Sequence, residues 1–120
     1  MSQGELLMIW SEESRGGAIV ASPAGKIDES TANAFGSQLE QAAVRAAESD
    51  TKKLVLDCTG IEYMSSRGLR ALTLAKRKAD GAGAAILLAA PNDIITEILA
   101  ISRYDKLFKV TDTVEAALAA

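Results

Sequence analysis

The sequence predicts a single α/β domain spanning residues 1–120, with a mixed, mainly parallel sheet covered by helices. Two apolar runs, within 53–57 and 84–90, are too short for helices and are typical of strands buried on both faces. Segments with helical spacing of apolar residues follow each of them. Because parallel strands need crossover connections, this alternation favours the element order β-β-α-β-α-β-α-β-α.

The chain is expected to begin with a β-hairpin and a helix. Residues 5–10 and 18–24 are apolar and favour strands, and the glycines of 15–17 suit a turn between them. The next segment is helical, and Asp28, Ser30 or Thr31 can cap it. Its apolar positions recur at helical spacing: Phe35, Leu39, Ala42, Ala43 and Ala46.

The remaining elements follow in alternation. Lys53–Asp57 is the predicted central strand, and Ser65 and Ser66 open a helix that runs to about Asp80 and ends at Gly81. Residues 84–90 form another buried strand. Pro91, Asn92 and Asp93 start a helix with a broad apolar face, made of Ile94, Ile95, Ile98, Leu99 and Ile101. A short strand at 107–110 then precedes a terminal helix capped by Thr111 or Asp112 and carrying Val114, Ala117 and Leu118.

Composition argues against several classes of function. A net charge of −3 lacks the basic excess of a nucleic-acid-binding domain. The chain has no histidine, so Ser-His-Asp and Cys-His catalysis and Cys/His zinc sites are excluded. The lone cysteine, Cys58, follows an apolar strand and is expected to be buried and inert. We therefore expect a protein that is not an enzyme and needs no cofactor or metal.

No part of the sequence predicts insertion into a membrane. The first ten residues lack a positive segment followed by a long apolar one, and no apolar run reaches the roughly 20 residues that span a bilayer. A cytoplasmic location is the expectation.

The most informative stretch is 54–70, LVLDCTGIEYMSSRGLR, in which two serines follow a buried strand and a short connection. It resembles the STAS-domain anti-sigma factor antagonists, whose motif reads Asp-Ser-Ser/Thr-Gly-Leu or Ser-Ser-Ala-Gly-Leu. The resemblance extends to 25–32, similar to the family's Gly-x-Leu-Asp segment, and to 98–108, similar to its Leu-x-x-x-Gly-Leu-x-x-x-Phe ending. Two departures are Ser65, where Asp is frequent, and Arg67, where a small residue is common, and the usual Gly is replaced near Tyr104.

The resemblance implies a function and a set of partners. The second motif residue is the phosphorylation site of the family, which places the acceptor at Ser66. The unphosphorylated protein would bind an anti-sigma factor with a serine-kinase fold and so free a sigma factor, and a PP2C-type phosphatase would restore it. An alternative within the same fold is a STAS adaptor subunit of a lipid-transport or other multiprotein assembly, in which Ser66 is only a helix cap.

Ser66 also suits phosphorylation on physical grounds. A hydroxyl in the first turn of a helix lies near unpaired N–H groups and the positive end of the helix dipole, and Arg67 and Arg70 add positive charge nearby. Ordinary capping is the competing interpretation, because serine is favoured at helix starts whatever the function. Ser65 is expected to cap the helix or to orient Ser66.

The other candidate partner-binding residues are Asp28, Ser65, Arg67, Arg70 and Leu74. Asp28 either helps to form the partner surface or a polar contact near Ser66, or caps a helix. Arg70, Leu74 and Lys78 recur every four residues, so that they share one helix face. This face is either a docking surface or a solvated surface with Leu74 partly buried.

Overall fold

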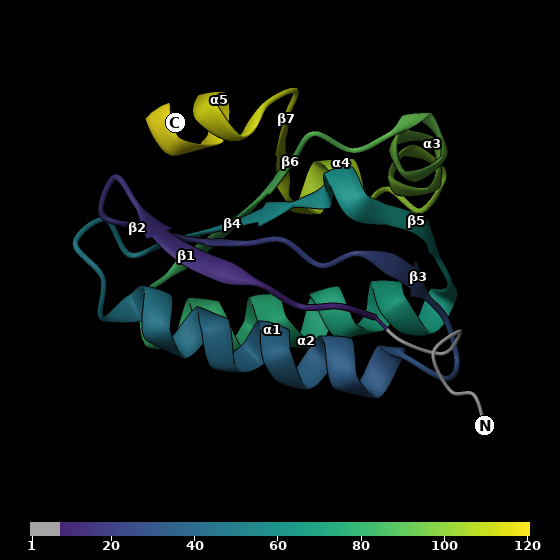
Figure 1. Cartoon of the computed structure of the whole chain (residues 1–120), viewed down its shortest axis with the longest axis horizontal. Helices are drawn as coiled ribbons and strands as arrows, with labels where there is room; N and C mark the ends of the chain where they lie inside the picture. The colour runs from purple at the N-terminus through teal and green to yellow at the C-terminus, as the bar shows by residue number, and fades with distance from the viewer. Residues whose placement is uncertain (1–7) are drawn as a thin grey trace.

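The computed structural model describes residues 8–120 and shows a sheet with helices on both faces (Figure 1). The five-stranded sheet has the order β1-β2-β4-β6-β7 and contains Glu12–Arg15, Ala18–Ala21, Lys53–Asp57, Ala85–Ala89 and Lys109–Thr111. β1 and β2 are antiparallel, and every other neighbouring pair is parallel. A separate parallel pair joins β3 (Gly25–Ile27) to β5 (Ile61–Met64). The predicted mixed, mainly parallel α/β domain is confirmed.

Helices α1 (Ala32–Ala47) and α2 (Ser66–Ala82) lie together on one face of the sheet (Figure 1). The short helix α5 (Val114–Ala119) covers the other face, and α3 (Asp93–Ile101) packs beside β5. α4 (Tyr104–Leu107) and the 3₁₀ turn η2 (Cys58–Gly60) complete the fold. No helix among the described residues is both long and apolar enough to cross a membrane.

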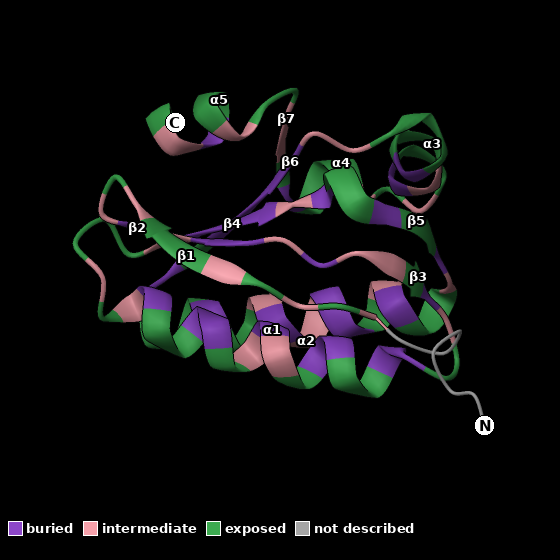
Figure 2. Ribbon diagram, viewed as in Figure 1, coloured by how far each residue is buried: buried purple, intermediate pink, exposed green. Residues whose placement is uncertain are grey.

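The core follows from the alternation of side chains along β4. Leu54, Val55 and Leu56 are all fully buried. Leu54 and Leu56 pack into the large cluster that includes the α1 and α2 side of the sheet, whereas Val55 joins the small cluster with Ala117 of α5. Figure 2 shows the sheet-facing sides of α1 and α2 as buried. β4 is the central strand of the five, as predicted. Helices cover both of its faces, which is why its apolar run is continuous.

The first strand differs from the prediction. Of the segment 5–10, residues 5–7 lie outside the described part, and Ile9 makes only an isolated bridge to Ala24. The hairpin strand is instead Glu12–Arg15, because Gly16 and Gly17, with φ of 58° and 80°, form a two-residue turn that pairs Arg15 with Ala18. Its polar side chains suit a sheet edge, so hydrophobicity does not reveal it.

Several element boundaries also differ from the predictions. β3, β5 and α4 are additional elements, and α2 ends at Ala82, before the left-handed Gly83. The last strand is Lys109–Thr111, and the terminal helix is capped by Thr113. The predicted broad apolar face of α3 is only partly packed, because Ile95 and Leu99 are buried while Ile94 and Ile101 are exposed.

Candidate functional site

The candidate site lies where the paired strands β3 and β5 end. Their last paired residues are Ile27 and Met64, so Asp28 and Ser65 follow the two strands at the same edge. The Ser65 N–H donates a hydrogen bond to the Ile27 carbonyl at 2.8 Å. The loop before α1 and the start of α2 are thereby held side by side.

Ser65 and Ser66 have different structural roles. Ser65 is the N-cap of α2, and its Oγ accepts a hydrogen bond from the Gly68 N–H at 3.4 Å. Its predicted capping role is confirmed. Ser66 is the first helical residue and is exposed, and within residues 8–120 its hydroxyl makes no hydrogen bond. The Ser66 hydroxyl is therefore accessible to solvent and is not used in holding α2 to the strands.

Gly68 lets the start of α2 pack closely against the strands β3 and β5. A Cβ at Gly68 would lie 2.5 Å from Met64 Cγ and 2.8 Å from Ile27 Cγ2, distances that real side chains do not tolerate. Since Ile27 is fully buried and stiff, only glycine lets α2 approach the β3–β5 pair this closely. The position of Ser66 thus depends on a glycine two residues later.

Asp28 stabilises the loop that leads into α1. Its Oδ1 accepts hydrogen bonds from the Ser30 hydroxyl at 2.8 Å and the Ser30 N–H at 3.0 Å. These bonds, with a weaker one from Thr31, lower the pKa of the Asp28 carboxyl below its ordinary value of 3.8. Thr31 holds the N-cap position of α1 but its side chain does not cap the helix. Its hydroxyl instead accepts the Asp28 N–H at 2.9 Å and donates to the Lys26 carbonyl at 2.7 Å.

Arg67 is paired with Glu29, which the sequence prediction missed. Arg67 Nε lies 3.4 Å from Glu29 Oε2, and both side chains are more than half exposed. The pair bridges α2 and the Asp28 loop across the end of the β3–β5 sheet. Only the pairing of β3 with β5 could have predicted this ion pair, and the sequence did not reveal that pairing.

Tyr63 is a second residue that the sequence prediction missed. It lies on β5 two residues before Ser65, and its side chain is 45% exposed. Aromatic side chains are enriched in protein interfaces. Tyr63 is therefore a candidate contact residue on the strand that leads to Ser65 and Ser66.

The structure places Arg70 and Leu74 on a different part of α2. Arg70 is exposed and Leu74 is half-buried, and both line a groove of about 960 Å³ between α1 and α2. Arg67 lies at the Ser66 end of the same groove. The predicted partner-binding residues thus form two neighbouring surfaces, the strand-end site around Ser66 and the α1–α2 groove.

The chain's one thiol is not available for chemistry at this site. Cys58 is buried, as predicted, and burial raises the pKa of its thiol to about 12. The Asp57 carboxylate raises it further, while a hydrogen bond with the Ala89 backbone acts in the opposite direction. A neutral, enclosed thiol is a poor nucleophile.

Comparison with known proteins identifies the family. A family model of the STAS domain matches residues 10–117, which is nearly the whole chain. The chain belongs to the STAS-domain family. The predicted resemblance is therefore confirmed.

Solved structures similar to this STAS domain agree with its fold. An anti-sigma factor antagonist from Mycobacterium paratuberculosis is 23% identical with a TM-score of 0.82, over 95% of this chain and 93% of that one. The anti-sigma factor antagonist SpoIIAA in its unphosphorylated form is 14% identical with a TM-score of 0.71, over 92% and 93%. The phosphorylated form of SpoIIAA, a Bacillus cell fate determinant, is 14% identical with a TM-score of 0.64, over 92% and 97%.

Proposed function

We propose that this STAS domain is an anti-sigma factor antagonist that binds an anti-sigma factor with serine-kinase activity only while Ser66 is unphosphorylated. The observation that carries the proposal is the division of roles at the start of α2. Ser65 and Gly68 hold the helix to the strands, whereas the Ser66 hydroxyl is exposed and makes no hydrogen bond to any residue from 8 to 120. The protein is a binding module rather than an enzyme.

The helix start favours a phosphate on Ser66. Backbone N–H groups of the first turn lack helical partners, and the helix dipole favours an anion there by about 0.3–1 kcal/mol. Arg67 is the nearest cation in sequence, and a phosphate would compete with Glu29 for it. The fold should therefore accept the modification with little loss of stability.

The same phosphate opposes binding of the partner. Phosphorylation adds about −1.5 to −2 charges at pH 7. A partner that covers Tyr63, Ser66 and Arg67 would have to remove water from this anion, and a poorly compensated buried charge costs several kcal/mol. Affinity should therefore fall by orders of magnitude. A PP2C-type phosphatase would restore the binding form, and the domain would act in the cytoplasm without contacting nucleic acid.

The test uses the anti-sigma factor candidates with a serine-kinase fold from the source organism, purified and assayed one by one. We expect one of them to phosphorylate wild type but not Ser66→Ala, and to bind Ser66→Ala better than Ser66→Asp. Ser14→Ala is the matched control, because Ser14 is an exposed serine on β1, outside the Asp28 loop and the start of α2. Phosphate located by mass spectrometry on Ser65, Thr59 or Ser30 would contradict the site assignment.

A second measurement tests the mechanism. Thermal unfolding and partner affinity are compared for the unmodified and phosphorylated protein, and binding should fall far more than stability. Either a large loss of folding stability or an unchanged partner affinity would refute a switch based on local charge. If no kinase modifies Ser66 and Ser66→Asp binds every partner normally, the domain is instead a STAS adaptor subunit of a multiprotein assembly.

A further inference from the structure

The groove between α1 and α2 is basic and partly apolar. Four cations line it, Arg45 of α1 and Arg67, Arg70 and Lys78 of α2, against one carboxylate, that of Glu40. Its largest apolar side chains are Val44 of α1 and Leu74 of α2. Within residues 8–120, Arg70 and Lys78 make no ion pair. The chain's net charge is −3, yet α2 carries five of its thirteen basic residues and one of its sixteen acidic ones. The groove is therefore suited to an acidic, partly apolar occupant.

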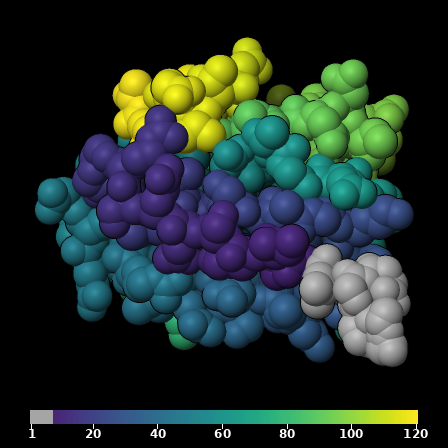
Figure 3. Space-filling model, in the orientation of Figure 1, coloured from purple at the N-terminus to yellow at the C-terminus, as the bar shows by residue number. Residues whose placement is uncertain are grey.

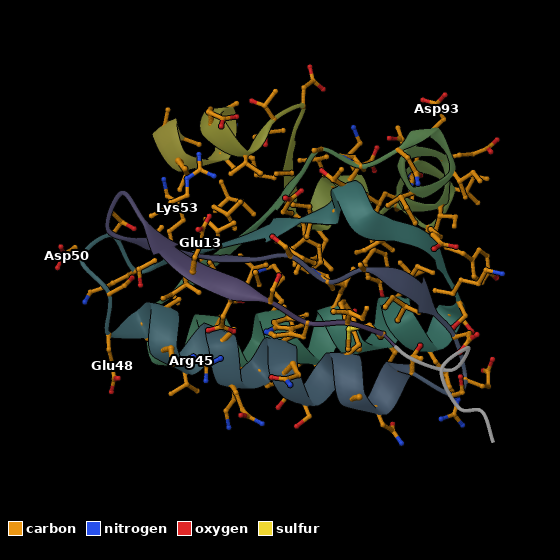
Figure 4. The ribbon with its side chains drawn as sticks, in the orientation of Figure 1. Glu13, Arg45, Glu48, Asp50, Lys53 and Asp93 are labelled. Carbon is orange, nitrogen blue, oxygen red and sulfur yellow. The ribbon has the colours of Figure 1, made fainter. Side chains whose placement is uncertain are left out.

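The exposed side of α3 has the complementary character. Ile94 and Ile101 are 54% and 77% exposed, and Glu97 lies between them on the same side of the helix. Asp93 adds a second carboxylate at the outer end of α3, where Figure 4 shows it pointing away from the domain. We call this surface, made of Asp93, Ile94, Glu97 and Ile101, the α3 ridge.

The lengths of the ridge and the groove agree. At about 1.5 Å per residue, the nine-residue helix α3 is about 14 Å long. The groove wall from Arg67 to Lys78 is about 17 Å long on the same rise. Ile94 and Ile101 are about 10 Å apart along the helix, so Glu97 would lie between two apolar contacts and within reach of the groove's cations.

The two surfaces cannot meet within one molecule. α1 and α2 cover one face of the sheet, whereas α3 projects at the opposite corner (Figures 1 and 3). Only the ridge of another copy can reach the groove. Such a contact joins unlike surfaces, so each copy retains one unused groove or ridge and the assembly can continue.

We propose that the α3 ridge of one copy docks into the α1–α2 groove of a second copy, giving a weak head-to-tail association. A single helix in a groove buries less than the roughly 1,200 Å² of a standard interface, and interfaces of that size are typical of weak, transient association. The proposal is independent of the proposed function, since it requires neither an anti-sigma factor nor phosphorylation.

Sedimentation of the purified chain from 10 µM to 1 mM tests the proposal. We expect the average mass to rise above 12.6 kDa with concentration and to return toward it in high salt. The groove variant Arg70→Glu/Lys78→Glu and the ridge variant Ile94→Ser/Ile101→Ser should each associate at least tenfold more weakly. The matched control Arg77→Glu/Lys109→Glu, with the same charge change at exposed positions outside the groove, should behave as wild type.

Mixing the two defective variants gives the decisive result. The groove variant retains its ridge and the ridge variant retains its groove, so an equimolar mixture should form a dimer and nothing larger. A wild type that stays monomeric at 1 mM would overturn the proposal and leave the groove to another kind of partner. A monomeric mixture, association beyond a dimer, or a groove variant that associates like wild type would overturn it equally.

Discussion

Replacing Gly68 with alanine should destabilise the domain even though alanine favours helices. In an exposed helix interior the change stabilises by up to about 1 kcal/mol. At Gly68 the new methyl group would meet Met64 Cγ at 2.5 Å and Ile27 Cγ2 at 2.8 Å. Overpacking of this kind costs about 1–3 kcal/mol. After the helix-propensity gain of about 1 kcal/mol is subtracted, we expect a net loss of up to about 2 kcal/mol, or up to roughly 8 °C in the unfolding temperature.

The same helix provides a control for this prediction. A Cβ at Gly81 would meet no atom within 4 Å, so Gly81→Ala should stabilise by about 0.5–1 kcal/mol. Urea and thermal unfolding of both variants, followed by circular dichroism, measure the contrast. If Gly68→Ala proved as stable as Gly81→Ala, α2 would not rest on Ile27 and Met64 as described. Ser66 phosphorylation should also be slowed in Gly68→Ala, because the helix start must shift to make room.

Three further predictions concern the residues around the site. Ser65→Ala removes the N-cap of α2 and should lower stability by about 0.5–1 kcal/mol in chemical denaturation, whereas an unchanged midpoint would mean that the cap is dispensable. Because hydrogen bonds from Ser30 lower the pKa of Asp28, its ionised form contributes stability above pH 3.8, which is lost as the pH falls through the folded pKa. The stability difference between wild type and Asp28→Ala should therefore shrink below pH 4, and a difference independent of pH would contradict this. Native Cys58, with its pKa raised to about 12, should react with a thiol reagent far more slowly than in urea, and rapid native labelling would show that the strand end opens.

The elements that the sequence predicted well are those with a strong local signal. The five positions predicted as the apolar face of α1 are all fully buried, because their spacing follows one side of a helix. Leu54, Val55 and Leu56 form the central strand because a short, continuous apolar run is buried on both faces. Ser65 was predicted to cap α2 because its position and chemistry both suit the first turn.

The elements that the sequence did not predict depend on contacts between distant segments. β3 and β5 have three and four residues, too few for a period, and each exists through pairing with the other. The Arg67–Glu29 contact follows from that pairing. The outward isoleucines of α3 could not be recognised from spacing, since spacing shows that Ile94 is apolar but not which side of the helix meets the sheet.

The position of the phosphate decides whether a modification here switches binding or unfolds the helix start. The Ser65 hydroxyl accepts the Gly68 N–H and its own N–H is bonded to Ile27, so a phosphate on Ser65 would disturb the contacts that join α2 to the strands. Ser66 is one residue further along the helix, and its exposed hydroxyl has no such partner within residues 8–120. It can therefore carry a change of nearly two charges at the surface while the neighbouring serine keeps the helix in place. The proposed phosphorylation switch requires this separation of binding from folding, and the two adjacent serines would provide it because the helix starts between them.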